Sequence, residues 1–135
     1  MGLQEKRLIK DFQDSKLPGL IKEIEKFVAC PVDIDWDTLT MTDGVDSSYW
    51  ADSWVKVYFD PIISGFKEIA SDDMGREALK DGVKKIEICN KSDQYGPSGI
   101  TFNGGVLRID HKPCTNVDYG HERAQQIVTV LSKAL

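Results

Sequence analysis

Cysteine and long hydrophobic runs are both scarce in this sequence. Its three cysteines, Cys30, Cys89 and Cys114, are odd in number and widely spaced. They are a poor basis for a disulfide framework, which favours a reducing compartment. No stretch approaches the roughly 18 apolar residues of a membrane-spanning helix, and residues 1–10 are too polar for a secretory signal. We therefore expect a cytoplasmic protein that does not engage a membrane.

Familiar catalytic motifs are missing as well. The sequence contains no G-x-S-x-G, no H-E-x-x-H, and no glycine-rich phosphate loop between a strand and a helix. The glycines of NGG at 103–105 are better explained by a tight hairpin turn than by a phosphate site. No cofactor is predicted.

The charge balance is mildly acidic. The formal net charge is −5, and basic residues are interspersed with acidic ones. Such a chain repels a phosphate backbone, so binding to nucleic acid is disfavoured. With 135 residues, 41% hydrophobic and 29% charged, the composition is that of an ordinary globular protein. We expect a single domain over residues 1–135 with one core. The sequence leaves the oligomeric state open.

Helical periodicity dominates much of the chain. Apolar residues recur at helical spacing over 3–29, 50–60, 61–69, 71–82 and 118–135. Pro18 is expected to interrupt the first stretch, because proline cannot donate an intrahelical hydrogen bond. Pro61 is expected to end one helix at Asp60 and to open the next. In the last stretch, His121 and Arg123 are expected to face solvent.

Strand periodicity appears at 32–37, 84–90 and 99–110. In the third stretch, a two-residue Gly-Gly turn would place Phe102 opposite Leu107 and Ile100 opposite Ile109, with all four on one face.

The polar residues 90–99 are interpreted as a long hairpin loop. The order is therefore two helices, a strand, three helices, three strands and a helix. We predict an α+β fold with a mostly antiparallel sheet of about four strands, one face covered by helices and the other partly solvated.

Three aspartates alternate along the first strand. In VDIDWD, Asp33, Asp35 and Asp37 point away from Val32, Ile34 and Trp36. Oxygen ligands of this kind suit a divalent cation, and a row of carboxylates also suits a basic protein surface. The simplest alternative is a solvated sheet face whose edge is protected by charge. Among the functional interpretations we favour a protein partner.

An aromatic segment follows the strand. Tyr49 and Trp50 open a helix in which Trp50 and Trp54 lie four residues apart. Packing in the core accounts for this spacing most simply. Tyrosine and tryptophan are also frequent anchors in protein interfaces, so Tyr49 and Trp50 are candidate binding residues.

Both histidines lie in LRIDHKPCTNVDYGHER, residues 107–123. His111, Cys114 and His121 could form a metal site or a thiol active site, with Asp110 orienting a histidine. The same residues are explained by a strand end with His111 facing inward, followed by a helix capped at 115 or 116. We favour this structural explanation, since structural zinc sites normally show two close ligand pairs. An enzyme centred on these residues is the alternative function.

The leading hypothesis is therefore a small acidic, non-catalytic protein-binding module. Its expected partner is another protein with a basic surface, and an inhibitor or immunity-like role fits the size and the charge. Asp33, Asp35, Asp37, Tyr49 and Trp50 are the predicted binding residues.

Overall fold

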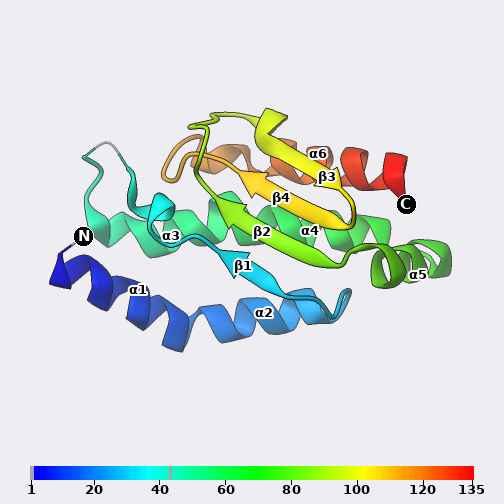
Figure 1. The fold of residues 1–135 in the computed structure, drawn as a ribbon, viewed down its shortest axis with the longest axis horizontal. Helices are drawn as coiled ribbons and strands as arrows, with labels where there is room; N and C mark the ends of the chain where they lie inside the picture. The colour runs from blue at the N-terminus through cyan, green and yellow to red at the C-terminus, as the bar shows by residue number, and fades with distance from the viewer. Residues whose placement is uncertain (1, 43) are drawn as a thin grey trace.

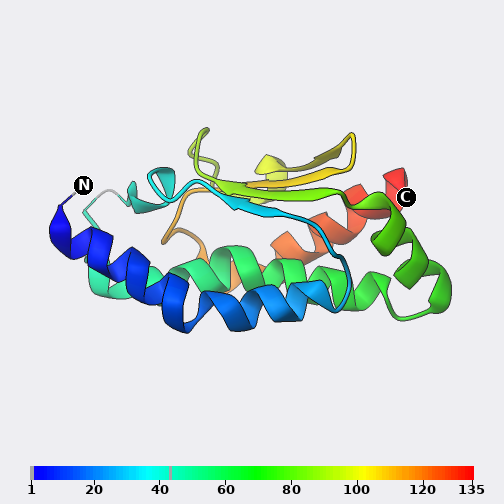
Figure 2. The same cartoon turned by 60° about the horizontal axis from the view of Figure 1, so that its bottom comes forward.

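The computed structural model describes residues 2–42 and 44–135. A layer of helices covers one face of a four-stranded sheet, and the other face is open (Figures 1 and 2). Within the described residues, no helix combines the length and the apolar character that crossing a membrane requires. The helices are α1 (Leu3–Ser15), α2 (Leu17–Glu25), α3 (Trp50–Trp54), α4 (Asp60–Ile69), α5 (Asp73–Gly82) and α6 (Gly120–Ala134). The strands are β1 (Val32–Ile34), β2 (Lys85–Cys89), β3 (Ile100–Asn103) and β4 (Val106–Asp110).

The mixture of helices and strands and their order along the chain are as predicted, but the sheet is not mostly antiparallel. Its strand order is β1-β2-β4-β3. β1 pairs with β2 in parallel, β2 pairs with β4 in parallel, and β3 pairs with β4 in an antiparallel manner. The prediction is wrong because β4 lies between β2 and β3. Residues 90–99 therefore lead to the far edge of the sheet and are not a hairpin loop.

The predicted hairpin register is confirmed. Ile100 pairs with Ile109, and Phe102 pairs with Leu107. The two turn glycines have φ angles of 58° and 81°, which glycine adopts without the steric cost that other residues meet. A two-residue turn with both central residues at positive φ matches the twist of the strands, and it fixes the register.

One face of the sheet forms the core with the helices. The inward side chains of β2 and β4 and Ile100 of β3 are almost fully buried, and they belong to one cluster with apolar residues of α4 and α6. Phe102 of β3 is partly buried against this cluster. An aromatic group extends this core toward α1, where the rings of Phe12 and Trp54 meet edge to face at 5.2 Å. The buried members of the sheet and of the two helices include Ile86, Ile88, Ile100, Leu107, Ile109, Ile62, Phe66, Ile127 and Leu131.

The helical backbone runs without interruption through Pro61. We expected the helix to end at Asp60, but a π-helical segment, Val55–Phe59, joins α3 directly to α4. A proline inside a helix leaves a carbonyl of the preceding turn without its donor. The wider π-helical turn accommodates the ring, and the unpaired carbonyls need donors from elsewhere.

Arg123 of α6 supplies these donors. Its Nε donates to the Val57 carbonyl at 3.1 Å, and its Nη2 lies 3.4 Å from the Lys56 carbonyl. Nη1 donates to the carbonyl of Asn116 at 2.8 Å, and Nη2 also lies 3.5 Å from that of Val117. The side chain is only 1% exposed, so the expectation that it faces solvent is wrong. Burial lowers the pKa of this guanidinium.

Candidate binding surface

The negative charge of the chain is concentrated in one stretch. Between Lys26 and Lys56 the sequence has six aspartates and no lysine, arginine or histidine. Of the 22 acidic residues, the other sixteen are balanced by the 17 basic ones. Residues 27–55, here called the acidic segment, therefore account for the whole net negative charge.

The part of the acidic segment that follows β1, as far as the structure describes it, lies at one end of the molecule (Figure 1). The segment contains β1, a 3₁₀ turn at Thr38–Thr40, a second at Ser47–Tyr49, and α3. Figure 1 shows that the arrowheads of β1, β2 and β4 point toward the end of the molecule at which the chain passes from β1 to α3. The parallel strands thus bring the polar loops that follow them to the same end as the acidic segment.

The three predicted aspartates do not form a single row. β1 ends at Ile34, which is earlier than the alternation suggested. Asp33 lies on the open sheet face, where its side chain is 65% exposed and 3.6 Å from the Lys85 amine. Asp35 follows the strand and accepts a long hydrogen bond from the Thr38 amide at 3.5 Å. Asp37 is exposed at the start of the 3₁₀ turn.

Asp33 and Asp35 nevertheless share a hollow on the open sheet face. It has a volume of about 190 Å³ and also contains Glu87, Lys91 and Arg108. The buried Nε of Arg108 has no hydrogen-bond partner. The hollow contains three carboxylates and two cations, so its local charge is mixed with a small negative excess.

The connection between β1 and α3 exposes apolar side chains among its aspartates. Tyr49 is 63% exposed, Met41 56% and Val45 37%. Asp46 caps the second 3₁₀ turn by accepting a hydrogen bond from the Ser48 amide at 2.8 Å. That bond lowers the pKa of Asp46, so the carboxylate stays charged. Sequence reasoning missed Met41 and Val45, and the long absence of basic residues was the available signal.

Trp50 and Trp54 secure the base of this connection. Trp50 is 5% exposed and its ring lies 5.9 Å from that of Trp54. The Trp54 indole donates to the carbonyl of Leu39 at 3.1 Å inside the core. Of the two aromatic residues proposed as anchors, only Tyr49 is therefore presented to solvent.

The histidines and Cys114 occupy separate environments. His111 is fully buried, as its strand parity predicts, and burial lowers its pKa. The thiol of Cys114 is half-buried beside Ser53, and burial raises its pKa. His121 is exposed and lines a cleft of about 340 Å³ with Asp60 and other residues. Within residues 2–42 and 44–135, no three histidine, cysteine or acidic side chains are arranged to hold a metal ion.

Asp110, which the enzyme interpretation uses to orient a histidine, binds a neighbouring loop instead. Its carboxylate accepts hydrogen bonds from the Lys91 amide at 2.8 Å and from the Ser92 hydroxyl at 2.9 Å. The side chain is 7% exposed. Asp110 therefore ties the loop after β2 to the end of β4.

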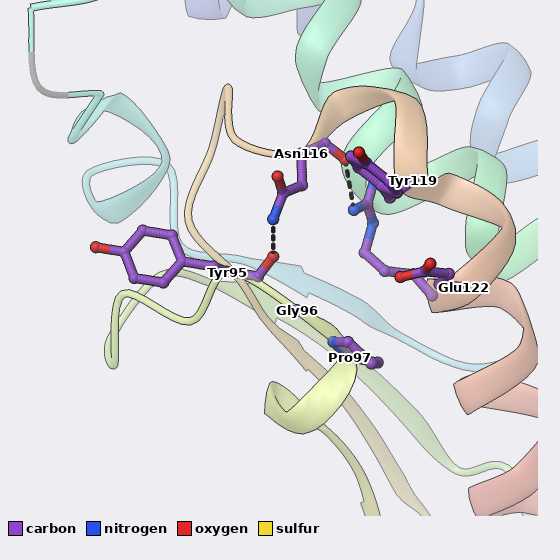
Figure 3. A pocket seen from close by; sticks show the side chains of 7 residues that line it. Tyr95, Gly96, Pro97, Asn116, Tyr119 and Glu122 are labelled. Carbon is purple, nitrogen blue, oxygen red and sulfur yellow. Dashed lines mark hydrogen bonds between the residues drawn. The ribbon is translucent and has the colours of Figure 1, made fainter.

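A small pocket lies between the loop before β3 and the start of α6 (Figure 3). The Asn116 amide donates to the Tyr95 carbonyl, and the Asn116 carbonyl accepts from Arg123. We expected residue 115 or 116 to cap the next helix, but no side-chain cap forms at Asn116. The pocket holds about 150 Å³, and three of its lining residues are engaged in these internal bonds. Its seven lining residues are Tyr95, Gly96, Pro97, Asn116, Tyr119, Glu122 and Arg123.

No protein family model, curated protein or solved structure matches this chain. Function is therefore inferred from the surface and its chemistry.

Proposed function

We propose that this chain is a non-catalytic protein-binding module whose acidic segment contacts a partner with a basic surface. The supporting observation is that residues 27–55 contain six aspartates and no basic residue. Asp33 and Asp52 each pair with a lysine outside this stretch. Exposed Tyr49 lies among the aspartates of the stretch. Charge and an exposed aromatic ring thus occur together at one end of the molecule.

Each part of this surface has a physical role in the proposal. Asp33, Asp35 and Asp37 attract the partner, since complementary charges raise the rate of encounter and disfavour partners of the same sign. Tyr49 is the proposed anchor, because tyrosine buries a large rigid area and still offers a hydroxyl group. Met41 and Val45 add apolar contact area beside it.

An inhibitor or immunity-like role fits this chemistry best, because such a protein neutralises a partner by covering a basic surface. The proposal places the protein in the cytoplasm. All three cysteines are free thiols, a state that a reducing compartment maintains.

The enzyme alternative finds less support. A cysteine nucleophile reacts as its thiolate, and burial raises the pKa of the Cys114 thiol. His111 is enclosed by the core, and His121 belongs to a cleft whose lining contains neither Cys114 nor His111. These side chains lack the convergence that a nucleophile and its base require.

The test is affinity capture from a native cell lysate with a triple variant, Asp33→Asn, Asp35→Asn and Asp37→Asn. The matched control changes three exposed acidic residues on α1, α2 and α5, namely Asp11→Asn, Glu25→Gln and Glu77→Gln. The control and the triple variant therefore have the same net charge.

We expect a basic partner that the control captures and that the triple variant loses, with capture by the wild type weakening as salt rises. Equal capture by both variants, or no captured partner, would contradict the proposal.

A further inference from the structure

β3 is an edge strand with main-chain groups directed away from the sheet. Hydrogen bonds alternate along an antiparallel pair. Asn103 pairs with Val106 across the two-residue turn, so Asn103 and Thr101 bond to β4. The main-chain groups of Ile100 and Phe102 therefore point to the open side. The Ile100 amide donates to a carbonyl of the preceding 3₁₀ turn. The Ile100 carbonyl and the amide and carbonyl of Phe102 therefore remain available to bond with another strand.

The two edges of the sheet are protected to different degrees. β1, at the other edge, has only three residues, with Asp33 at its centre and Pro31 before it. Short length, charge and proline are the usual means by which edge strands avoid pairing with another chain. The sequence of β3 is Ile-Thr-Phe-Asn, which has no charge, no proline and three residues of high β propensity.

The surroundings of β3 are depleted of charge as well. Residues 94–107 and residues 125–132 contain no charged side chain, in a chain that is 29% charged. The second stretch belongs to α6, which packs against β3 and runs beside it (Figure 1). By contrast, the 13 residues of α1 include six charged ones. Depletion of charge is characteristic of the centres of protein interfaces.

We propose that a second copy of this chain pairs with β3, antiparallel and about a twofold axis, to form a homodimer with one continuous eight-stranded sheet. Two copies of a chain with net charge −5 repel one another least at an uncharged surface. A twofold axis also satisfies both edges at once, because each strand meets its own equivalent.

Charge at the two ends of α6 agrees with this arrangement. Glu122 and Lys133 are both exposed, near the first and last turns of the helix. The twofold axis that makes the strands antiparallel also makes the two α6 helices antiparallel. Glu122 of each copy is then directed toward the Lys133 end of the other. The dimer leaves the acidic segment uncovered and is independent of the proposed function.

The test uses a charge at the proposed axis. The Thr101 side chain is exposed on the outer sheet face, opposite Arg108 of β4. Thr101→Glu therefore adds a favourable pair within one chain. Across the axis it brings two carboxylates together, directly opposite or diagonal. Thr101→Val is the matched uncharged variant.

Sedimentation velocity over a range of concentrations measures the dimer. We expect the wild type and Thr101→Val to dimerise and Thr101→Glu to raise the dissociation constant by about tenfold or more. Hydrogen exchange gives a second measurement. The Phe102 amide should become protected as concentration rises, whereas the Thr101 amide, bonded to β4, should be protected throughout.

Three results would overturn the proposal. The first is a wild type that stays monomeric up to about 1 mM, since a dissociation constant above that concentration would mean very weak binding. The second is dimerisation of Thr101→Glu that is unchanged from the wild type. The third is hydrogen exchange at the Phe102 amide that does not depend on concentration.

Discussion

Replacing Arg123 with methionine is expected to remove about 3 kcal/mol from the free energy of unfolding. The guanidinium makes two short bonds, to the carbonyls of Asn116 at 2.8 Å and Val57 at 3.1 Å. The Val57 carbonyl is buried, and a buried carbonyl that loses its donor costs about 1 to 3 kcal/mol. The Asn116 carbonyl is only partly buried, so its loss adds about 1 kcal/mol. The two contacts at 3.4 and 3.5 Å are counted as minor. Methionine retains most of the apolar volume, so cavity formation adds little.

Urea denaturation at pH 7, followed by circular dichroism, measures this change. Lys133→Met in the same helix is the control, since an exposed substitution there should alter stability by under about 0.5 kcal/mol. Arg123→Lys is expected to fall between the two, because one ammonium group satisfies fewer of the carbonyls. A loss below about 1 kcal/mol for Arg123→Met would refute this account of the carbonyls.

A double mutant cycle tests whether Arg123 replaces the donor that Pro61 lacks. Pro61→Ala restores an amide N–H beneath the carbonyls of Lys56 and Val57. In that background, Arg123→Met should cost about 1 kcal/mol less than in the wild type. Strict additivity would show that the two residues act independently.

Three further changes report on other parts of the molecule. Burial lowers the pKa of His111, so the unfolded chain binds more protons and stability is lost as pH falls from about 6.5 toward the folded-state pKa. Urea midpoints between pH 5 and 7 should depend less on pH in His111→Asn, whereas the exposed His121→Asn should match the wild type. Tyr49→Ala should reduce partner capture with little loss of stability, whereas Trp50→Ala should lower the free energy of unfolding, measured by thermal denaturation, by about 3 to 5 kcal/mol. A large loss of stability for Tyr49→Ala and a small one for Trp50→Ala would contradict the exposed and buried positions assigned to them. Gly105→Ala should destabilise by about 1 kcal/mol, because its φ is +81° and an added Cβ would lie 2.8 Å from a lysine side chain; an unchanged melting temperature would exclude this strain.

The hairpin could be predicted because its determinants are local. Two adjacent glycines specify the turn, and the turn specifies which residues of β3 and β4 face each other. The parallel pairings could not be predicted in this way. Strands with one open face alternate in the same manner whether their neighbours are parallel or antiparallel. Nothing within residues 90–99 indicates that β4 lies between β2 and β3.

The candidate site was predicted in part. The aspartates were recognised from charge alone, but the end of β1 at Ile34 separated them. Trp50 and Trp54 follow the helical spacing that places both in the core, whereas Tyr49 lies one position outside that stripe. Arg123 resembles a surface residue in sequence. Its side chain bonds to the carbonyls of Lys56 and Val57, which lie far away along the chain and meet it only through tertiary packing.

The bond between the Trp54 indole and the Leu39 carbonyl closes the connection between β1 and α3 at its base. This contact fixes the two ends of the connection to the core. The fold therefore does not depend on most of the side chains that the connection exposes to solvent. Doubling the length of such a loop costs only about 0.6 kcal/mol in closure entropy. Residues between Leu39 and Tyr49 can thus diverge in sequence and length while the scaffold stays intact. Under the proposed function, a few substitutions there would change which partner is bound.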